Sequence, residues 1–223
     1  MNVLIFGATG MVGQGVLREC LLDAGVQLVT TIGRTASDAH HPKLRQIVHP
    51  DLFNYSSIEP ELTGFEACFF CLGVSSAGMK EPDYERVTYA LTLAAAETLS
   101  RLNPRMTFIY VSGAGTDSSE KGRGMWARVK GKTENALLRL PFKGAYMFRP
   151  GFIEPLHGIR SRTAVYRVLY TLVTPLLPVA HWAFPGQILT TERIGRAMLA
   201  VARNGAPKRI LESRDINAIV SGS

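Results

Sequence analysis

The fold of this chain is decided by its opening stretch, Val3-Leu4-Ile5-Phe6-Gly7-Ala8-Thr9-Gly10-Met11-Val12-Gly13. The first four residues are apolar and predict a buried strand, and a helical apolar pattern follows the glycines. A bare glycine backbone can approach a phosphate, and the amino end of a helix offers unpaired N–H groups to negative charge. The spacing G-x-x-G-x-x-G between strand and helix therefore predicts a dinucleotide cradle, with a plain tight turn as the alternative.

The end of the second predicted strand, residues 26–32, indicates which dinucleotide is bound. It is followed by Gly33-Arg34-Thr35, at the place where a carboxylate would bind the ribose 2′-hydroxyl of NAD(H). Arg34 instead offers a planar, permanently charged group suited to a 2′-phosphate, and Thr35 adds a hydroxyl donor. These residues favour NADP(H) over NAD(H); a solvated surface arginine is the alternative.

The composition fits one domain over residues 1–223. Of the 223 residues 46% are hydrophobic, which is ample for one buried core. The apolar start is short and has no basic leader, and three cysteines suit a reducing compartment, so we expect no signal peptide and a cytoplasmic protein. The net charge of +7 comes without a nucleic-acid motif, so we expect no nucleic-acid partner.

One pattern resembles a metal or redox motif. Cys68 and Cys71 are spaced as C-x-x-C, but they lie in an apolar run that predicts a buried strand. An offset of three residues along a strand puts them on opposite faces, about 10 Å apart, which is too far for a disulfide. We expect both to be small buried hydrophobes, and because the histidines have no ligand spacing we expect no metal site.

The rest of the chain alternates strand and helix patterns. Repeated strand–helix crossovers imply an α/β fold with a doubly wound parallel sheet, which binds ligands at the carboxyl ends of its strands. A small C-terminal substrate lobe is expected from residues 151–190 and the end of the chain. The predicted strands are 44–48, 68–72, 106–111, 145–148 and 208–211, and the predicted helices are 84–102 with Asp83 as its cap, 125–140, 191–202 and one from Ser213.

These pieces, in this order, resemble the atypical and extended short-chain dehydrogenase/reductases, Rossmann-fold proteins often named after nucleotide-sugar epimerases. The resemblance spans the chain and is clearest over residues 1–152. It implies that Asp51 and Leu52 flank the adenine of an NAD(P) cofactor and that Cys71-Leu72-Gly73-Val74 passes beneath the adenosine ribose. It also implies that Arg149-Pro150-Gly151-Phe152 closes over the nicotinamide end, although a plain turn would explain that segment too.

The resemblance breaks at the active site. Family members use a serine after the fifth strand and Tyr-x-x-x-Lys on the next helix, and the matching residues here are Ser112 and Lys130, with Trp126 in the place of the tyrosine. An indole N–H donates a hydrogen bond but does not titrate near neutrality. The resemblance therefore leaves Lys130 to bind cofactor and Ser112 to bind a substrate oxygen, while the usual acid is missing.

Two functions follow. The first is an NADP(H)-dependent oxidoreductase or epimerase-like enzyme with altered acid/base chemistry, in which Ser112, Lys130, water or a tyrosine such as Tyr84 or Tyr89 handles the proton. The second is a non-catalytic NADP(H)-binding redox sensor or regulatory protein. A misaligned helix is a third interpretation, which the continuation Lys130-Gly131-Lys132-Thr133-Glu134 argues against.

An apolar stretch over residues 164–184 is interrupted by Pro175 and Pro178 and is not expected to span a membrane. It is expected to form the core of the lobe or a dimer contact, with an apolar ligand pocket or a lipid-binding surface as the alternative. The expected partners are a small-molecule substrate, for which an apolar compound is a candidate, and a second copy of the chain paired through its long helices.

Overall fold

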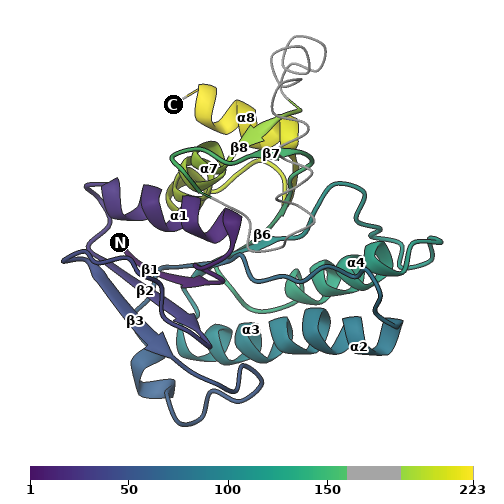
Figure 1. Cartoon of the computed structure of the whole chain (residues 1–223), viewed down its shortest axis with the longest axis horizontal. Helices are drawn as coiled ribbons and strands as arrows, with labels where there is room; N and C mark the ends of the chain where they lie inside the picture. Colours follow the sequence, from purple (N-terminus) through teal and green to yellow (C-terminus); the bar gives the residue numbers. More distant parts are fainter. Residues whose placement is uncertain (160–186, 223) are drawn as a thin grey trace.

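A parallel sheet of seven strands forms the centre of the computed structural model, which describes residues 1–159 and 187–222 (Figure 1). The strand order is β3-β2-β1-β4-β5-β6-β9, and every pairing is parallel. The apolar stretch 164–184 lies outside the described residues. The strands are β1 (Asn2–Phe6), β2 (Leu28–Gly33), β3 (Leu44–Val48), β4 (Ala67–Phe70), β5 (Thr107–Val111), β6 (Gly144–Arg149) and β9 (Ile210–Glu212).

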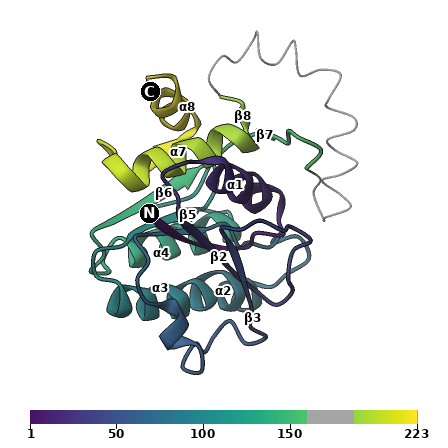
Figure 2. The same cartoon turned by 90° about the vertical axis from the view of Figure 1, so that its left-hand side faces the viewer.

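Helices cover both faces of the sheet (Figure 2). One layer holds α1 (Met11–Leu22), α7 (Thr191–Asn204) and α8 (Ser213–Ser221). The other holds α2 (Glu81–Glu85), a wider π-helical turn η2 (Arg86–Ala90), α3 (Leu91–Leu102) and α4 (Met125–Leu137). A short 3₁₀ helix, η1 (Glu59–Leu62), follows β3, and β7 (Ile153–Glu154) pairs with β8 (Leu189–Thr190) in a separate two-stranded sheet.

The strands are apolar throughout because both of their faces are buried. Along β1, Val3 and Ile5 point into the core beneath α1 and α7, whereas Leu4 and Phe6 point into the core beneath α3. The predicted doubly wound parallel α/β sheet is therefore confirmed. The predicted strands and helices are all present among the described residues, with ends that coincide or differ by at most three residues.

The long helix after β4 begins earlier than predicted. It starts at Glu81 after Lys80, without a side-chain cap, so the prediction that Asp83 caps it was wrong. Pro82 stands in the first turn, where a missing N–H costs nothing and the fixed φ favours a helix. The helical path then runs through η2 and α3 to Leu102.

Helix α1 is held against α7 at two glycines. A Cβ on Gly15 would stand 2.6 Å from the Cβ of Thr191, and one on Gly195 would stand 2.7 Å from Cγ of Glu19. Such close approach is possible only without side chains at these positions. This contact fixes the position of α1, so that its amino end lies at the carboxyl ends of the strands.

Within the described residues, no helix is long and apolar enough to cross a membrane, and no three His, Cys, Asp or Glu side chains gather as a metal site. The three cysteines are free; Cys20 and Cys68 are buried and Cys71 is partly buried. The single domain, the absence of a nucleic-acid partner and the pairing of two copies through the long helices stay predictions.

Candidate functional site

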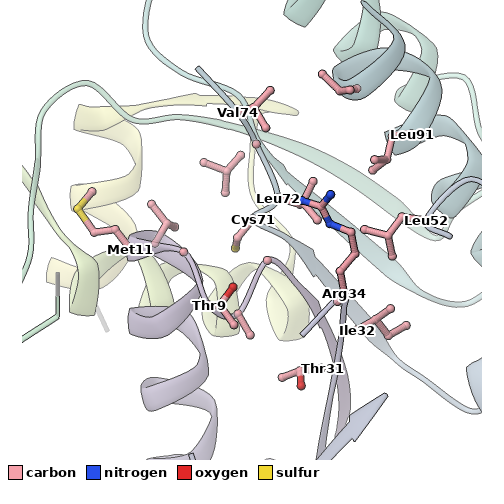
Figure 3. Close-up of a pocket in the computed structure, with 18 of the residues that line it drawn as sticks. Thr9, Met11, Thr31, Ile32, Arg34, Leu52, Cys71, Leu72, Val74 and Leu91 are labelled. Atoms are coloured by element: carbon pink, nitrogen blue, oxygen red, sulfur yellow. The ribbon is translucent and has the colours of Figure 1, made fainter. Parts of the chain in front are cut away.

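A cleft of about 1350 Å³ opens at the carboxyl ends of the strands, beside the point where the strand order reverses between β1 and β4. Open α/β sheets bind their ligands at such a reversal. Most of the residues expected to hold the cofactor line this cleft: Gly7, Thr9, Gly10, Met11, Val12, Arg34, Thr35, Asp51, Leu52, Cys71, Leu72, Gly73, Lys130, Pro150 and Gly151. Figure 3 labels Thr9, Met11, Arg34, Leu52, Cys71 and Leu72 among them. Ser112, expected in catalysis, lines it as well.

The glycine turn is built for close approach of a ligand to its backbone. Gly7 has a φ of 75°, in the left-handed region that glycine favours, and its carbonyl accepts a 2.9 Å hydrogen bond from the N–H of Gly10. Gly13 does not line the cleft, but a Cβ there would lie 2.0 Å from the Gly7 oxygen. Gly13 therefore lets α1 pack directly against the turn.

The amino end of α1 suits an anion. Its cap residue, Gly10, makes no side-chain capping bond, and its first turn has no acidic residue. The N–H groups of Met11 and Val12 have no hydrogen-bond acceptor among residues 1–159 and 187–222. A Cβ on Gly10 would project into the cleft and meet only the Gly7 oxygen, at 3.3 Å. The turn thus has both the donors and the open space that a dinucleotide pyrophosphate requires.

Arg34 follows from the end of β2 into the cleft. Figure 3 shows its side chain extending toward Leu52 and Leu72. The side chain is exposed and makes no ion pair with any residue that the structure describes. The carboxylate of Asp51, the one acidic group among the described lining residues, accepts a 2.9 Å hydrogen bond from the N–H of Phe53. Arg34 is therefore available to an anionic ligand.

The other end of the cleft rests on a buried ion pair that sequence reasoning missed. The Glu134 carboxylate on α4 is 0% exposed, and its two oxygens accept hydrogen bonds of 3.0 and 3.2 Å from Nε of Arg149 on β6. Ser112 Oγ donates to the same carboxylate at 2.5 Å. A charge buried this deeply requires such partners. The hydroxyl hydrogen of Ser112 is thus committed to Glu134 and is not free for a ligand.

Lys130 lies one helical turn before Glu134 on α4 and lines the cleft. Its ammonium group donates a short hydrogen bond to the backbone oxygen of Ser112. Burial lowers the pKa of Lys130 to about 8, although Glu134 nearby acts in the opposite direction. Lys130 is therefore a cation that can lose its proton close to neutral pH.

Trp126 stands on α4 four residues before Lys130, as expected, but it is not among the described residues that line the cleft. Its indole covers Gly115, where a Cβ would lie 3.3 Å from the ring, and the side chain is 37% exposed. Phe152 is also outside the lining; its carbonyl accepts a 3.0 Å hydrogen bond from the N–H of Leu189 beside the β7–β8 pair.

Neither tyrosine considered as an alternative acid reaches the cleft. Tyr84 is buried in the helical layer. Tyr89 lies beneath Lys132, whose Nζ is 4.6 Å from the centre of the Tyr89 ring. No tyrosine is present among the described lining residues. The thiol of Cys71 does line the cleft, but burial raises its pKa to about 12. Lys130 is thus the group at this end of the cleft whose pKa lies closest to neutrality.

Comparison with known proteins agrees with this geometry. A model of the "NAD dependent epimerase/dehydratase family" matches residues 3–122. "Protein FMP52-2, mitochondrial" of Scheffersomyces stipitis is 26% identical over 216 residues, covering 96% of this chain and 90% of that protein. "Protein fmp52, mitochondrial" of Emericella nidulans is 30% identical over 159 residues, covering 68% and 66%. The Bordetella bronchiseptica enzyme WbmF, solved in complex with NAD⁺, is 17% identical with a TM-score of 0.68, covering 99% of this chain and 77% of WbmF, and shares the fold.

The comparisons overturn one expectation from the sequence. Several fungal relatives are named as mitochondrial proteins, so the prediction of a cytoplasmic protein was wrong. That prediction rested on composition, cysteine usage and the short apolar start. A Rossmann core has the same buried strands and glycine turn in any compartment, so its composition does not report where the protein is located.

The family model covers more than half of the chain, including the glycine turn, the end of β2 and Ser112. The fold, the position of the cleft and the glycine turn all fit a protein that holds a nicotinamide dinucleotide. The chain belongs to the NAD-dependent epimerase/dehydratase family.

Proposed function

We propose that this protein is an NADP(H)-dependent oxidoreductase of the short-chain dehydrogenase/reductase type, in which Lys130 takes the part of the missing tyrosine. The observation that carries the proposal is the pair of cationic side chains at the two ends of one cleft. Arg34 lies at the adenosine end without an ion pair among the described residues, and Lys130 lies at the other end beside Ser112. Arg34 suits a 2′-phosphate, and Lys130 suits proton transfer.

The chemistry assigned to the chain is the movement of one proton. A bound nicotinamide cofactor would supply the hydride for reduction of a substrate carbonyl. Lys130 Nζ gives a proton to the carbonyl oxygen, so that an alcohol leaves, and it takes the proton back in the reverse direction. A pKa of about 8 keeps most of the side chain protonated at pH 7 while leaving the proton easy to transfer.

Ser112 has a different part from the one expected. Because its hydroxyl hydrogen is donated to Glu134, only a lone pair of the oxygen can face a ligand. Ser112 then accepts a hydrogen bond from a substrate hydroxyl and does not donate one to a carbonyl. This arrangement favours binding of the alcohol over binding of the carbonyl compound.

The substrate we propose is a small apolar carbonyl compound. Val111 and Ile153, which lie close to Ser112 and Gly151 in the chain, line the cleft, and these two side chains offer no hydrogen-bonding group. Burial of apolar ligand atoms against such a surface stabilises the complex. The surface offers no polar group to compensate for the water that a charged ligand group would lose.

The test is turnover of NADPH with a panel of aldehydes and ketones, followed by the absorbance of the reduced nicotinamide. We expect at least one apolar member to be reduced. Lys130→Met should lower kcat by a factor of about 10² or more, the usual contribution of a general acid. The matched control is Lys132→Met, because Lys132 lies on the same helix but pairs with Glu85 outside the cleft. Equal turnover by wild type and Lys130→Met would contradict the assignment.

A second function, a non-catalytic NADP(H) sensor, is favoured by one observation: the residue in the tyrosine position, Trp126, packs over Gly115 and not into the cleft. A sensor should bind NADP⁺ and NADPH with different affinities or change its oligomeric state with one of them. Calorimetry and size-exclusion chromatography with each cofactor measure both properties. Equal affinity with an unchanged oligomeric state would exclude this function.

A further inference from the structure

Phe53 stands at the mouth of the cleft, in the loop between β3 and η1. It is 39% exposed, and it lines the cleft next to Asp51 and Leu52. Burial of a large aromatic ring would stabilise the protein, and a ring exposed to water at the mouth of a binding site lacks this stabilisation. Neither the glycine turn nor Arg34 requires an aromatic ring at this position.

The loop holds Phe53 in place without a ligand. The N–H of Phe53 donates a 2.9 Å hydrogen bond to Asp51 Oδ1. Aspartate often forms such a turn, in which its side chain accepts a hydrogen bond from the backbone N–H two residues later. Just beyond, Nε2 of His49 lies 2.7 Å from the carbonyl oxygen of Asn54. The ring is therefore presented by a braced turn, which lowers the entropy lost when a ligand binds against it.

Arg86 contacts the ring from a different element of the fold. It belongs to η2, the helical turn whose Val87 lines the cleft, and its guanidinium carbon lies 5.2 Å from the centre of the Phe53 ring. This distance is typical of a cation–π contact. Arg86 makes no ion pair with any residue in the described ranges, so the aromatic face is the partner that the structure gives it.

We propose that Phe53 is a stacking platform for the adenine ring of the cofactor and that Arg86 is a positioning residue that holds the platform. The inference rests on the proposed NADP(H) function. Arg86 covers one face of the ring, and the ring also borders the cleft beside the two residues expected to flank the adenine, Asp51 and Leu52. Every purine has a flat π-face that stacks on an aromatic side chain.

The experiment is calorimetric titration with NADPH and with adenosine 2′,5′-bisphosphate, which has the adenine and the 2′-phosphate but no nicotinamide. Phe53→Leu should weaken both ligands by about 5-fold to 100-fold, the usual range for one stacked base. Phe53→Tyr, which keeps the aromatic face, should retain the affinity. The control is Leu22→Ala, because Leu22 is 64% exposed and does not line the cleft. Thermal melting checks that each variant is folded.

Arg86→Ala should weaken both ligands by about 2-fold to 5-fold in the wild-type background, as expected for an exposed cation–π contact. It should have no effect in the Phe53→Leu background, because it acts through the ring. Equal losses in both backgrounds would mean that Arg86 binds the nucleotide directly and would overturn its positioning role.

Two failures are distinguishable. If wild type binds both ligands and Arg34→Ala weakens them, but folded Phe53→Leu binds as wild type does, the platform is refuted and the proposed function stands. If wild type binds neither ligand, the proposed function and the platform are both refuted.

Discussion

Replacing Glu134 with glutamine removes the charge from the ion pair beneath the cleft while keeping the volume of the side chain. Arg149, itself 9% exposed, would keep only the half-exposed Glu212 carboxylate, 3.4 Å from its Nη1, as an ionic partner among the described residues. The Ser112 hydroxyl would lose a charged acceptor at 2.5 Å. The consequence should appear in the free energy of unfolding, because both losses belong to the folded state only.

The size of the effect follows from the burial of the pair. Removing one partner of a buried ion pair costs about 3–5 kcal/mol. Glu212, which is half-exposed, compensates the charge of Arg149 only in part. In a chain of this length each kcal/mol lowers Tm by about 2–4 °C, so Glu134→Gln should lower Tm by roughly 6–20 °C. Urea unfolding followed by circular dichroism gives the free energy directly, and an unchanged slope with denaturant shows that the comparison is two-state.

The matched control is Glu97→Gln on α3, an exposed glutamate without an ion pair among the described residues; it should stay within about 0.5 kcal/mol of wild type. A loss below about 1 kcal/mol for Glu134→Gln would contradict this expected cost. It would mean that the ion pair is exposed to water in solution or that Glu212 compensates the charge of Arg149 fully.

Three further outcomes are expected. Gly13→Ala should prevent folding or lower Tm strongly, since its Cβ would lie 2.0 Å from the Gly7 oxygen, whereas Gly73→Ala, with nothing within 4 Å, should melt as wild type does. The pKa of Lys130 is about 8 in the folded state and about 10.4 in the unfolded chain, so the unfolded chain binds more protons between these pH values. The free energy of unfolding of wild type, measured by urea titration and compared with that of Lys130→Met, should therefore rise from pH 8 to pH 10. A thiol reagent at pH 8 should leave the buried Cys20 and Cys68 unmodified in the native protein and should modify Cys71 only slowly, because the raised pKa of Cys71 keeps it a thiol; rapid labelling of Cys20 or Cys68 before unfolding would contradict their burial.

The sheet and the glycine turn could be predicted because their signals are local. An apolar run such as residues 3–6, three glycines and a helical pattern specify one strand–turn–helix unit, and repetition of strands and helices specifies the doubly wound sheet. Arg34 could be placed in the cleft because its distance along the chain from the glycines is set by this unit.

The network beneath the cleft could not be predicted because its members are far apart in the sequence. Ser112 follows β5, Glu134 lies on α4 and Arg149 ends β6, so the three meet only when those elements pack. Sequence reasoning therefore gave Ser112 a free hydroxyl. Glu134 itself was the signal in the sequence. It lies one turn after Lys130 on an otherwise buried face of the helix, and a buried carboxylate requires a partner.

The sequence correctly predicted that Trp126 lies on α4. The side chain, however, does not line the cleft. A spacing of four residues puts two side chains on one side of a helix, yet they reach in different directions according to their size and neighbours. The wide indole covers Gly115, where no side chain occupies the space, while the narrow stem of Lys130 reaches Ser112.

We propose that the end of β2 selects a cofactor with a 2′-phosphate. The experiment is calorimetric titration of wild type and Arg34→Ala with NADPH and NADH, with Arg101→Ala, an arginine paired to Glu59 on the surface, as the control. Wild type should bind NADPH more tightly than NADH, and Arg34→Ala should remove the difference by weakening NADPH alone. Equal binding of the two cofactors by wild type, or an NADPH affinity that Arg34→Ala leaves unchanged, would contradict it.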